Sequence, residues 1–432
     1  MHLAPTERQQ RLRAELRTYF RDLMPDGPPP ADDGARRRDL LRRIGADGLL
    51  GLGWPVAYGG QGRGADEQFV FFDEAYRAGA PVSMVTLNTV GPTLMAYGSE
   101  EQKAYFLPRI LSGEEVFAIG YSEPSAGTDL ASLRTRAVRV AGESGAGEDA
   151  EGGAGEGAES GSEGRAGGGV GSDAEGRDEG RGGPGGECWL IDGQKIFTSN
   201  AQHADWIWLA CRTDPDAPKH EGISILLVPT DAPGFSWTPI ETVGGLTTTA
   251  TYYDGVRVPA AHLVGEENGG WRLITSQLNH ERVALAALGM QAEDFHAAAL
   301  EAARTPDPVT GRRRIDEPWV RFRLAEVHAR LAANRLLSWR LVGDVGAGRL
   351  APGDASGVKF AGTESTVATY RMCQEIVGAQ ALVRAGSPGA FGDGELERLN
   401  RAAQINTFGG GVSEVQREIV ATMRLGMRRG RR

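Results

Sequence analysis

The segment Phe117-Ala-Ile-Gly-Tyr-Ser-Glu-Pro-Ser-Ala-Gly-Thr-Asp-Leu-Ala-Ser-Leu133 marks a change in the pattern of the chain. Its first residues have apolar side chains at every second position, which predicts a short β-strand. The strand then runs into small, turn-forming and hydroxyl residues. Small residues let a ligand approach the backbone closely, and Ser122 and Thr128 can hydrogen-bond carbonyl or phosphate oxygens. Taken alone, the pattern fits an ordinary strand-to-turn corner equally well.

The composition is that of a globular protein with more than one domain. The chain has 432 residues, of which 40% are hydrophobic and 24% are charged. A chain of this length is expected to form two or three domains that share an interface. It contains no run of about 18 apolar residues, and its N-terminal segment is charged throughout, so we predict neither a membrane-spanning helix nor a signal peptide.

The three cysteines, Cys188, Cys211 and Cys373, are odd in number, widely spaced and outside any Cys-x-x-Cys pattern. This arrangement predicts neither a disulfide framework nor a metal site. Free thiols fit a reducing compartment, and we therefore expect a cytoplasmic protein.

The net charge of −10 arises from one segment. Residues 141–187 contain 12 acidic and 3 basic residues, whereas the rest of the chain has 44 basic and 45 acidic residues. A nearly neutral remainder offers no basic surface to a nucleic acid, and the arginines at 428–432 fit a solvated terminus. We therefore predict no nucleic-acid partner.

Residues 141–187 also differ from the rest in composition. They are almost all Gly, Ala, Glu, Ser, Asp or Arg, and Val170 is the only large aliphatic residue among them. Such a segment buries too little apolar area to offset its ordering entropy, so we predict that it is disordered. It separates two strand-like segments that would otherwise make a hairpin, and loop-closure entropy grows slowly with length. We interpret it as a low-complexity insert without a catalytic role.

The spacing of apolar residues changes twice along the chain. Residues 1–116 and 265–432 show mainly helical spacing, whereas residues 117–264 alternate with a period of two. Turn-forming clusters separate the alternating segments, which is typical of an antiparallel β domain. After the first strand, we expect strands at 133–140, 189–196, 206–212, 223–229, 237–241 and 249–258. The predicted fold class is α+β, with an N-terminal helical domain, a middle antiparallel β domain and a C-terminal helical domain.

Four local motifs occur together in this chain. They are Tyr121-Ser-Glu-Pro-Ser-Ala-Gly-Thr-Asp129, Asp192-Gly-Gln-Lys-Ile-Phe-Thr-Ser-Asn200, the segment 269–283 with Leu278-Asn-His-Glu-Arg-Val283, and Thr407-Phe-Gly-Gly-Gly-Val-Ser-Glu-Val-Gln-Arg417. With these motifs the chain resembles the flavin-dependent acyl-CoA dehydrogenase family, over essentially its whole length apart from the acidic insert. The first two motifs are specific to that family. The resemblance implies FAD held where a helical domain, a β domain and a C-terminal four-helix bundle meet.

The resemblance also implies which residues contact the cofactor and the substrate. The positions that face the flavin are Ile119, Tyr121, Ser122, Phe197, Thr198 and Ser199. The physical chemistry agrees, because an aromatic side chain can stack on a flavin while hydroxyl and backbone N–H groups bond its polar edge. Thr128 matches a position that contacts the coenzyme A moiety.

The implied reaction is the α,β-desaturation of an acyl-CoA thioester. A base removes the α-proton while the β-carbon loses a hydride to FAD, and the electrons pass on to an electron-transfer flavoprotein. Because such a proton is weakly acidic, the thioester carbonyl must be polarised and the base must lie close by in a dry site. The base should be a carboxylate whose pKa is raised by burial.

The expected position of this carboxylate in the sequence differs from its position in many family members. In those members the base belongs to the fourth motif, where this chain has Gly410, which carries no side chain. Other members have a glutamate in a Glu-Arg dipeptide, which corresponds here to Glu281 and Arg282. The resemblance thus implies Glu281 as the catalytic base, with Arg282 and the backbone N–H of Gly410 as substrate-binding groups. Glu414 is the second candidate for the base, although a capping or surface role fits it better.

The spacing of apolar residues around Glu281 bears on this assignment. Intervals of three and four residues place one apolar stripe along a helix, and Glu281 lies on it. The stripe consists of Trp271, Ile274, Leu278, Leu285 and Leu288. An inward-facing carboxylate is costly unless it is paired, bound to a metal or functional. Arg282 does not share its face, so the alternative is a structural ion pair with another segment.

Two segments that reach the FAD of a neighbouring subunit in homotetrameric members are altered here. The first reads Gly311-Arg-Arg-Arg-Ile-Asp-Glu-Pro-Trp319, without a match in register, and the second reads Glu375-Ile-Val-Gly-Ala379. Glu375 replaces a neutral donor that would meet a pyrophosphate, and like charges repel. We therefore favour an α2β2 heterotetramer, in which a partner acyl-CoA dehydrogenase chain supplies the missing contacts, over a homotetramer. The fourth motif also resembles subunits of actinobacterial heteromers that act on steroid side chains.

Two other functions fit the same residues. A flavin oxidase or monooxygenase on the same fold would react with oxygen instead of an electron-transfer flavoprotein. A non-catalytic subunit would stabilise an active partner chain. For the dehydrogenase, three kinds of acyl group stay open: a straight fatty acyl group, a branched acyl group and the side chain of a steroid.

Overall fold

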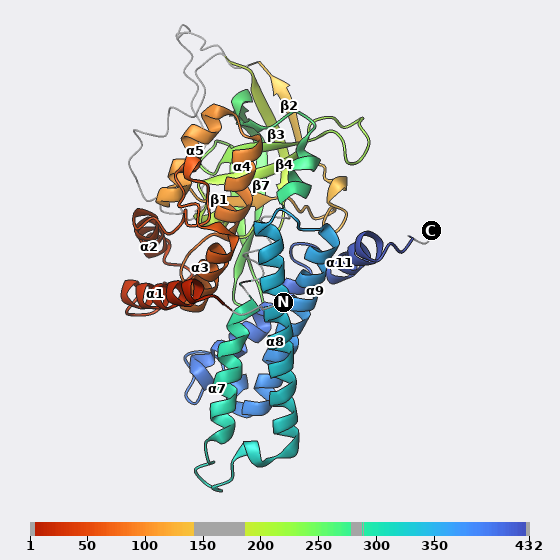
Figure 1. The fold of residues 1–432 in the computed structure, drawn as a ribbon. Helices are drawn as coiled ribbons and strands as arrows, with labels where there is room; N and C mark the ends of the chain where they lie inside the picture. Colours follow the sequence, from red (N-terminus) through yellow and green to blue (C-terminus); the bar gives the residue numbers. More distant parts are fainter. Residues whose placement is uncertain (1–4, 142–185, 278–286, 288, 429–432) are drawn as a thin grey trace, which may run out of the picture.

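The computed structural model describes residues 5–141, 186–277, 287 and 289–428, and its elements follow the order helices, sheet, helices (Figure 1). The N-terminal helices lie beside the sheet, and the long C-terminal helices α7, α8 and α9 extend away from both. This arrangement confirms the predicted α+β fold class. None of the helices within the described ranges is long and apolar enough to cross a membrane.

Two of the N-terminal helices, α1 and α5, begin at reciprocal side-chain caps. The elements are α1 (Glu7–Leu23), α2 (Gly34–Ala46), α3 (Gly64–Ala78), a π-helical turn (Val85–Val90), α4 (Gly91–Tyr97) and α5 (Glu100–Ser112). At the start of α1, the Thr6 hydroxyl accepts a hydrogen bond from the Gln9 N–H, and the Gln9 side chain accepts one from the Thr6 N–H. Ser99 and Gln102 make the same reciprocal cap at α5, which satisfies backbone donors that a helix start would otherwise leave unpaired.

The described residues in the middle of the chain form one sheet of eight strands, in which β1 pairs with β4 and the other strands follow the order β6-β7-β3-β2-β4-β5-β8. The strands are β1 (Phe117–Gly120), β2 (Arg136–Val140), β3 (Cys188–Lys195), β4 (Trp206–Arg212), β5 (Ile223–Pro229), β6 (Phe235–Glu241), β7 (Thr247–Pro259) and β8 (Leu263–Val264). The predicted bounds of β4 and β5 are confirmed, and those of the other predicted strands differ by at most three residues.

Two pairings in this sheet are parallel, whereas the sequence predicted an antiparallel domain. β1 runs parallel to β4 along its whole length, and β2 meets β4 in parallel at Arg136. Both strands lie along one edge of β4, because residues 121–135 leave the sheet after β1 and return to the same edge at β2. The other pairings are antiparallel. The first motif is therefore a loop that departs from and rejoins one strand edge.

The strands on either side of the acidic insert pair with each other. β2 and β3 form an antiparallel hairpin in which Val140 lies opposite Cys188, as the sequence predicted for the segments flanking residues 141–187. The predicted disorder of the insert concerns residues 142–185, which lie outside the described residues.

β4 is buried on both faces because the sheet packs against two hydrophobic cores. On one face, Phe117 and Trp208 pack with apolar side chains of the N-terminal helices and with residues 273–274. On the other face, Ile207 and Leu209 pack with residues of β3 and β7. Alternate residues of β4 thus belong to different cores, as the two-residue period of a strand requires.

The C-terminal helices form a bundle with a core of its own. After a helical segment at residues 270–277, the helices are α7 (Ala292–Arg304), α8 (Pro318–Gly346), α9 (Pro352–Val377), α10 (Glu395–Ala402) and α11 (Ser413–Ile419). Buried side chains of α7, α8, α9 and α10 share this core. The predicted C-terminal four-helix bundle is confirmed.

An ion-pair network ties the N-terminal helices to this bundle. Arg77, in the last turn of α3, lies 2.8 Å from Asp73 on the same helix, 3.1 Å from Glu293 and 2.5 Å from Asp294 on α7. Asp73 is fully buried and also contacts Arg13 of α1 at 2.5 Å. Because a buried charge is unfavourable without a partner, this network fixes α1, α3 and α7 against one another.

We predict that Arg77→Met destabilises the protein by about 2 kcal/mol, because it removes the charge-assisted hydrogen bond between Arg77 and the buried Asp73. Methionine fills a similar volume but leaves the buried Asp73 with Arg13 as its cationic partner. The loss should appear as a lower thermal unfolding temperature at neutral pH. Arg21→Met is the matched control, because Arg21 forms an exposed pair with Asp22 and such pairs contribute little. Equal effects of the two substitutions would contradict the prediction.

Candidate active site

The first and second motifs lie next to each other in the structure. β1 ends at Gly120, and the chain leaves the sheet through Tyr121 and Ser122. The Ile196 N–H donates a hydrogen bond of 2.8 Å to the Ser122 carbonyl oxygen. This bond joins the end of β1 to the turn that follows β3, and the residues predicted to face the flavin in both motifs thus form one wall.

A buried ion pair fastens the same two segments. Glu123 Oε1 of the first motif lies 2.8 Å from Lys195 Nζ at the end of β3, and their side chains are 5% and 0% exposed. The Lys195 ammonium also donates to the Tyr121 carbonyl at 3.2 Å. The Glu123 carboxylate accepts two further bonds, from the N–H groups of Arg134 at 2.7 Å and Thr135 at 2.8 Å. One carboxylate therefore holds both ends of the loop 121–135 and the end of β3.

Burial and charge act in opposite directions on this pair. Burial alone would raise the pKa of the Glu123 carboxyl, but the Lys195 ammonium and the Thr135 N–H hold that pKa below its ordinary value. Burial lowers the pKa of Lys195, and the Glu123 charge opposes that change. Glu123 is therefore ionised at neutral pH.

A glycine directs the end of β3 to this position. β3 has a bulge between Ile191 and Gly193. Gly193 has a φ of +146°, and a Cβ there would lie 2.8 Å from the Thr135 Cα. Only glycine tolerates both this φ and this close approach. A bulge bends its strand, and here it does so two residues before Lys195.

The turn after β3 presents an aromatic ring at the surface. Phe197 is 60% exposed and has a left-handed φ of +62°, which is uncommon for a residue other than glycine. The next residue, Thr198, is fully buried. Its N–H donates to the Thr249 carbonyl at 2.9 Å, and its carbonyl accepts the Thr249 hydroxyl at 2.6 Å. The Ser199 and Thr248 hydroxyl oxygens lie 3.2 Å apart.

These residues fit a flavin. A strained backbone conformation is retained only where the surrounding structure enforces it, and such residues cluster at active sites and ligand sites. A planar ring system is a natural partner for the face of Phe197. Ser122 is partly exposed and Ser199 is exposed, so both hydroxyl groups can reach a polar edge. Their individual contacts with FAD stay a prediction.

The Tyr121 side chain points to other parts of the protein. Its hydroxyl accepts a hydrogen bond of 3.1 Å from the indole N–H of Trp208 on β4 and donates one to the side-chain oxygen of Gln277. Gln277 is 2% exposed and lies on the helical segment 270–277. Ile119, a partly buried residue of β1, lies opposite Trp208 in the strand register. Tyr121 and Ile119 thus line the boundary between the sheet and the first C-terminal helical segment.

Of the other predicted site residues, Thr128 lies within the described residues, whereas Glu281 and Arg282 do not. Thr128 is exposed on the loop of the first motif, next to Asp129, which pairs with Lys219. The predicted base Glu281 and its neighbour Arg282 lie outside the described residues. Their roles therefore stay predictions from the sequence.

Gly410 lies in an exposed loop of the fourth motif and has a φ of +66°. The ammonium of Lys359, a buried residue of α9, donates to the carbonyls of Asn406 at 3.0 Å and Gly411 at 2.6 Å. These bonds hold the loop against α9 on both sides of Gly410. Glu414 is exposed in the first turn of α11, a position that agrees with a surface role.

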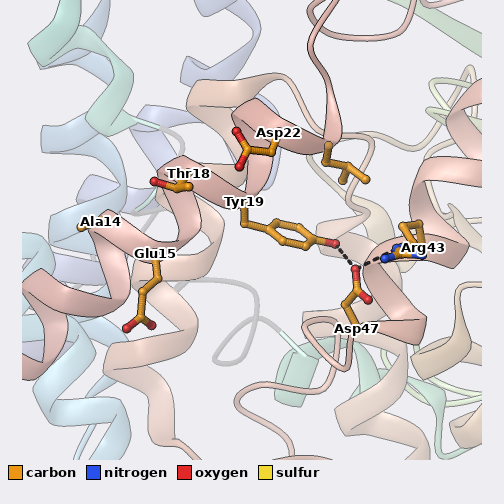
Figure 2. Close-up of a pocket in the computed structure, with 8 residues that line it drawn as sticks. Ala14, Glu15, Thr18, Tyr19, Asp22, Arg43 and Asp47 are labelled. Atoms are coloured by element: carbon orange, nitrogen blue, oxygen red, sulfur yellow. Dashed lines mark hydrogen bonds and ion pairs between the residues drawn. The ribbon is translucent and has the colours of Figure 1, made fainter.

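An open cleft of about 800 Å³ lies elsewhere, between α1 and the C-terminal end of α2 (Figure 2). On its polar side, the Tyr19 hydroxyl donates to the Asp47 carboxylate at 2.8 Å, and Arg43 bonds the same carboxylate at 3.1 Å. Burial, together with the Asp47 hydrogen bond and charge, raises the pKa of Tyr19, so its hydroxyl stays protonated. None of the predicted site residues lines this cleft, and we assign it no part in the chemistry.

Sequence reasoning singled out the two motifs that are predicted to face the flavin, but it missed the residues that join them. Glu123 and Lys195 stand inside these motifs, and their opposite charges are a signal that could have pointed to the pair. No local pattern pointed to Trp208 or Gln277, because both meet Tyr121 only through the tertiary structure.

The fold and this wall are those of an oxidoreductase that binds a flavin between a helical domain, a sheet and a helical bundle. Three family models match the chain: the acyl-CoA dehydrogenase N-terminal domain at residues 6–114, the middle domain at 166–256 and the C-terminal domain at 268–425. The chain belongs to the acyl-CoA dehydrogenase family. That family is FAD-dependent, and FAD is the cofactor of this enzyme.

The most similar relatives match over almost their whole length. Acyl-CoA dehydrogenase FadE26 of Mycobacterium tuberculosis is 44% identical, with all of both chains covered. The solved structure of the Tcur3481-Tcur3483 steroid ACAD is 48% identical, with a TM-score of 0.83 and full coverage of both chains. The ChsE4-ChsE5 complex from Mycobacterium tuberculosis is 44% identical, with a TM-score of 0.82 and full coverage of both chains.

We predict that Glu123→Gln lowers stability by about 3 kcal/mol at neutral pH, because it leaves the buried Lys195 without its anionic partner. The pKa of Glu123 is depressed in the folded state, so its stabilising effect is complete above the ordinary value of 4.5 and is lost as the pH falls through the lowered value. The difference in unfolding temperature between wild type and variant should therefore shrink in acid.

Asp129→Asn is the matched control, because Asp129 also pairs with a lysine but on an exposed loop. Its unfolding temperature should follow the wild type at every pH. If the unfolding temperatures of wild type and Glu123→Gln differ by the same amount at neutral and at acid pH, the ionised Glu123 does not stabilise the fold through this ion pair.

Proposed function

We propose that this enzyme introduces an α,β double bond into an acyl-CoA thioester and passes the electrons to an electron-transfer flavoprotein. The observation that carries the proposal is the wall of residues 121–123 and 195–199. There the Glu123–Lys195 pair joins two family-specific motifs and Phe197 is held exposed. Bound against this wall by residues 119–122 and 197–199, FAD supplies the acceptor for the hydride of the β-carbon.

The chain's own part in the reaction is to remove the α-proton, and we assign this step to Glu281. Gly410 leaves the usual position of the base in the fourth motif without a carboxylate, and Glu281 precedes Arg282 as the base does in other members of the family. The described start of this helical segment supports the choice. Ile274 and Gln277 mark its buried face, and Glu281 follows Gln277 at the four-residue interval that repeats a helical face.

Substrate binding is assigned to three groups. Thr128 can hydrogen-bond the coenzyme A moiety, and Arg282 can bond the acyl-CoA beside the base. The backbone N–H of Gly410 can polarise the thioester carbonyl, because Lys359 holds the surrounding loop by two carbonyl bonds. Fixed donors stabilise a developing negative charge without reorganising during the reaction.

We propose that the acyl group is a steroid side chain. The solved structure of the Tcur3481-Tcur3483 steroid ACAD supports this choice, because it is 48% identical to this chain over its full length. The fourth motif supports it independently, since Thr407-Phe-Gly-Gly-Gly resembles subunits that act on such side chains.

We also propose that the active form is an α2β2 heterotetramer with a second acyl-CoA dehydrogenase chain. Glu375, which replaces a neutral donor of homotetrameric members, pairs with Arg323 of α8 at 3.0 Å. Arg314 donates to the Glu375 carbonyl at 3.1 Å. These arginines are thus engaged within the chain, and a carboxylate remains where a pyrophosphate would have to bind. The solved relatives Tcur3481-Tcur3483 and ChsE4-ChsE5 are themselves pairs of different chains.

Exposed apolar side chains near the C-terminus support an assembled state. Large hydrophobic residues are exposed on α8, in the fourth motif and in the last described helical turns. They include Trp319, Phe322, Leu336, Leu337, Ile405, Phe408, Met423, Leu425 and Met427. Clusters of exposed apolar residues on one part of a chain are typical of protein interfaces.

We predict that Glu281→Gln slows bleaching of the flavin absorbance by acyl-CoA at least about 100-fold while FAD stays bound. Glutamine has the same size but cannot accept the α-proton. Anaerobic stopped-flow spectroscopy with short, branched and steroid acyl-CoAs measures the rate, with and without the partner chain.

Glu414→Gln is the matched control, because Glu414 is exposed and should leave the bleaching rate unchanged. Bleaching of Glu281→Gln at the wild-type rate would show that Glu281 is not the base. Rapid reoxidation of the reduced enzyme by air would argue for an oxidase instead of a dehydrogenase.

The assembly gives a separate prediction. Purified alone, the chain should bind less than one FAD per polypeptide, and together with its partner it should form an α2β2 complex that retains FAD. Native mass spectrometry combined with flavin absorbance measures both quantities. A stable homotetramer with one FAD per chain would disprove the heteromer.

A further inference from the structure

The turn between β6 and β7 reaches from the sheet to the C-terminal bundle. This turn consists of residues 242–246, and the Thr242 hydroxyl closes it by donating to the Leu246 carbonyl at 2.6 Å. Gly244 is buried against α10, where a Cβ at Gly244 would lie 2.8 Å from the Ala402 Cα. Only glycine allows two backbones to come so close.

An arginine of α10 bonds the same turn. Arg401 donates one N–H to the Val243 carbonyl. Its remaining bonds, at 2.7 and 2.8 Å, form a fork on the Glu397 carboxylate of α10. A fork of two parallel bonds fixes the plane of the guanidinium group, so the donor to Val243 has a defined direction. The Arg401–Val243 bond and the packing of Gly244 on Ala402 together form what we call the hairpin contact.

On the side of the sheet, the hairpin contact leads directly to the wall of residues 121–123 and 195–199. β7 begins right after the turn, and its first residues hold the end of that wall. Thr249 exchanges two hydrogen bonds with Thr198, at 2.9 and 2.6 Å, and the Thr248 and Ser199 hydroxyl oxygens lie 3.2 Å apart. A shift of the turn would therefore be passed on to the wall.

On the side of the bundle, the hairpin contact leads to the loop of the fourth motif. α10 continues into the helical turn Ala403–Thr407. The N–H groups of Phe408 and Gly409 donate to the Ile405 carbonyl at 3.1 and 2.7 Å, which ties the loop to that turn. Gly410 is the next residue and is exposed. The hairpin contact thus joins the two parts of the candidate site.

We propose that Arg401 is a positioning residue for the dehydrogenation, and this inference rests on the proposed function. Through the hairpin contact it sets the separation between the wall that binds FAD and the Gly410 N–H that polarises the thioester carbonyl. The carbonyl carbon and the β-carbon flank the α-carbon of one acyl group, so the two surfaces that receive them must keep a fixed separation. A displacement of about 1 Å can slow such a reaction about 100-fold.

Two substitutions weaken the hairpin contact in different ways. Arg401→Met removes the donor to Val243, whereas Gly244→Ala leaves Arg401 intact and places a Cβ against the backbone of α10. Arg398→Met is the matched control, because Arg398 also lies on α10 and also forms a fork on a glutamate, with bonds of 2.9 and 2.7 Å to Glu395. It differs from Arg401, which additionally bonds the turn.

The first measurement is the single-turnover rate of flavin bleaching by acyl-CoA in the assembled enzyme. We expect Arg401→Met and Gly244→Ala to lower this rate by about 10- to 100-fold with the FAD content unchanged, and Arg398→Met to retain the wild-type rate. An unchanged rate in either folded variant would overturn the proposal, as would an equal loss in Arg398→Met. If Arg401→Met does not fold, Gly244→Ala decides.

The carbonyl stretching frequency of a bound 2-enoyl-CoA separates positioning from lost stability. A hydrogen bond from the Gly410 N–H polarises this carbonyl and lowers its frequency relative to that in solution. Isotope-edited infrared spectroscopy should show the frequency returning toward the solution value in Arg401→Met and Gly244→Ala, and staying at the wild-type value in Arg398→Met. A wild-type frequency in the first two variants would overturn the proposal.

Binding of an enoyl-CoA requires no electron transfer, so this readout distinguishes the inference from the proposed function. If no acyl-CoA bleaches the wild type, the proposed function fails, whereas the carbonyl frequencies still test the inference. Hydrogen exchange at the Gly409 amide gives a readout without any CoA ligand. Exchange should be faster in Arg401→Met and Gly244→Ala than in the wild type and Arg398→Met, and equal exchange in all four proteins would overturn the proposal.

Discussion

The buried ion pair between Glu123 and Lys195 is the interaction on which the candidate site depends. Taking two such charges out of water costs several kcal/mol for each ion, so a pair of this kind persists only with good geometry and further hydrogen bonds. Here Glu123 also receives the N–H groups of Arg134 and Thr135, and Lys195 donates to the Tyr121 carbonyl. These bonds close the loop of the first motif onto the end of β3. The two motifs that are predicted to face the flavin are thereby positioned by one contact.

The topology of the sheet explains why this pair lies where three parts of the chain meet. β1 and β2 share one edge of β4, so the loop between them projects from that edge instead of crossing the sheet. The core on one face of β4 continues into the N-terminal helices and the segment 270–277. A loop at this edge therefore lies beside the N-terminal helices and the helical segment 270–277. The bulge at Gly193 completes the arrangement by directing β3 toward the loop.

The departures of this chain from other family members have a common pattern. The two motifs that are predicted to face the flavin are present in full, whereas Gly410 and Glu375 replace residues that other family members are expected to use for the base and for a neighbour's cofactor. Exposed apolar residues concentrate in the same C-terminal part. This distribution supports the proposed heterotetramer, in which a different partner chain supplies the FAD contacts that this chain lacks.

Several features follow from the sequence by itself because they depend on neighbouring residues. The alternation of side chains placed β4 and β5 at their observed bounds, and the two family-specific motifs indicated the family to which the chain belongs. The parallel pairing of β1, the Glu123–Lys195 pair and the Tyr121–Gln277 bond were decided only by the tertiary structure. The last two join residues 72 and 156 positions apart. The periodicity of apolar residues indicates which face of an element is buried, but it does not indicate which distant segment covers that face.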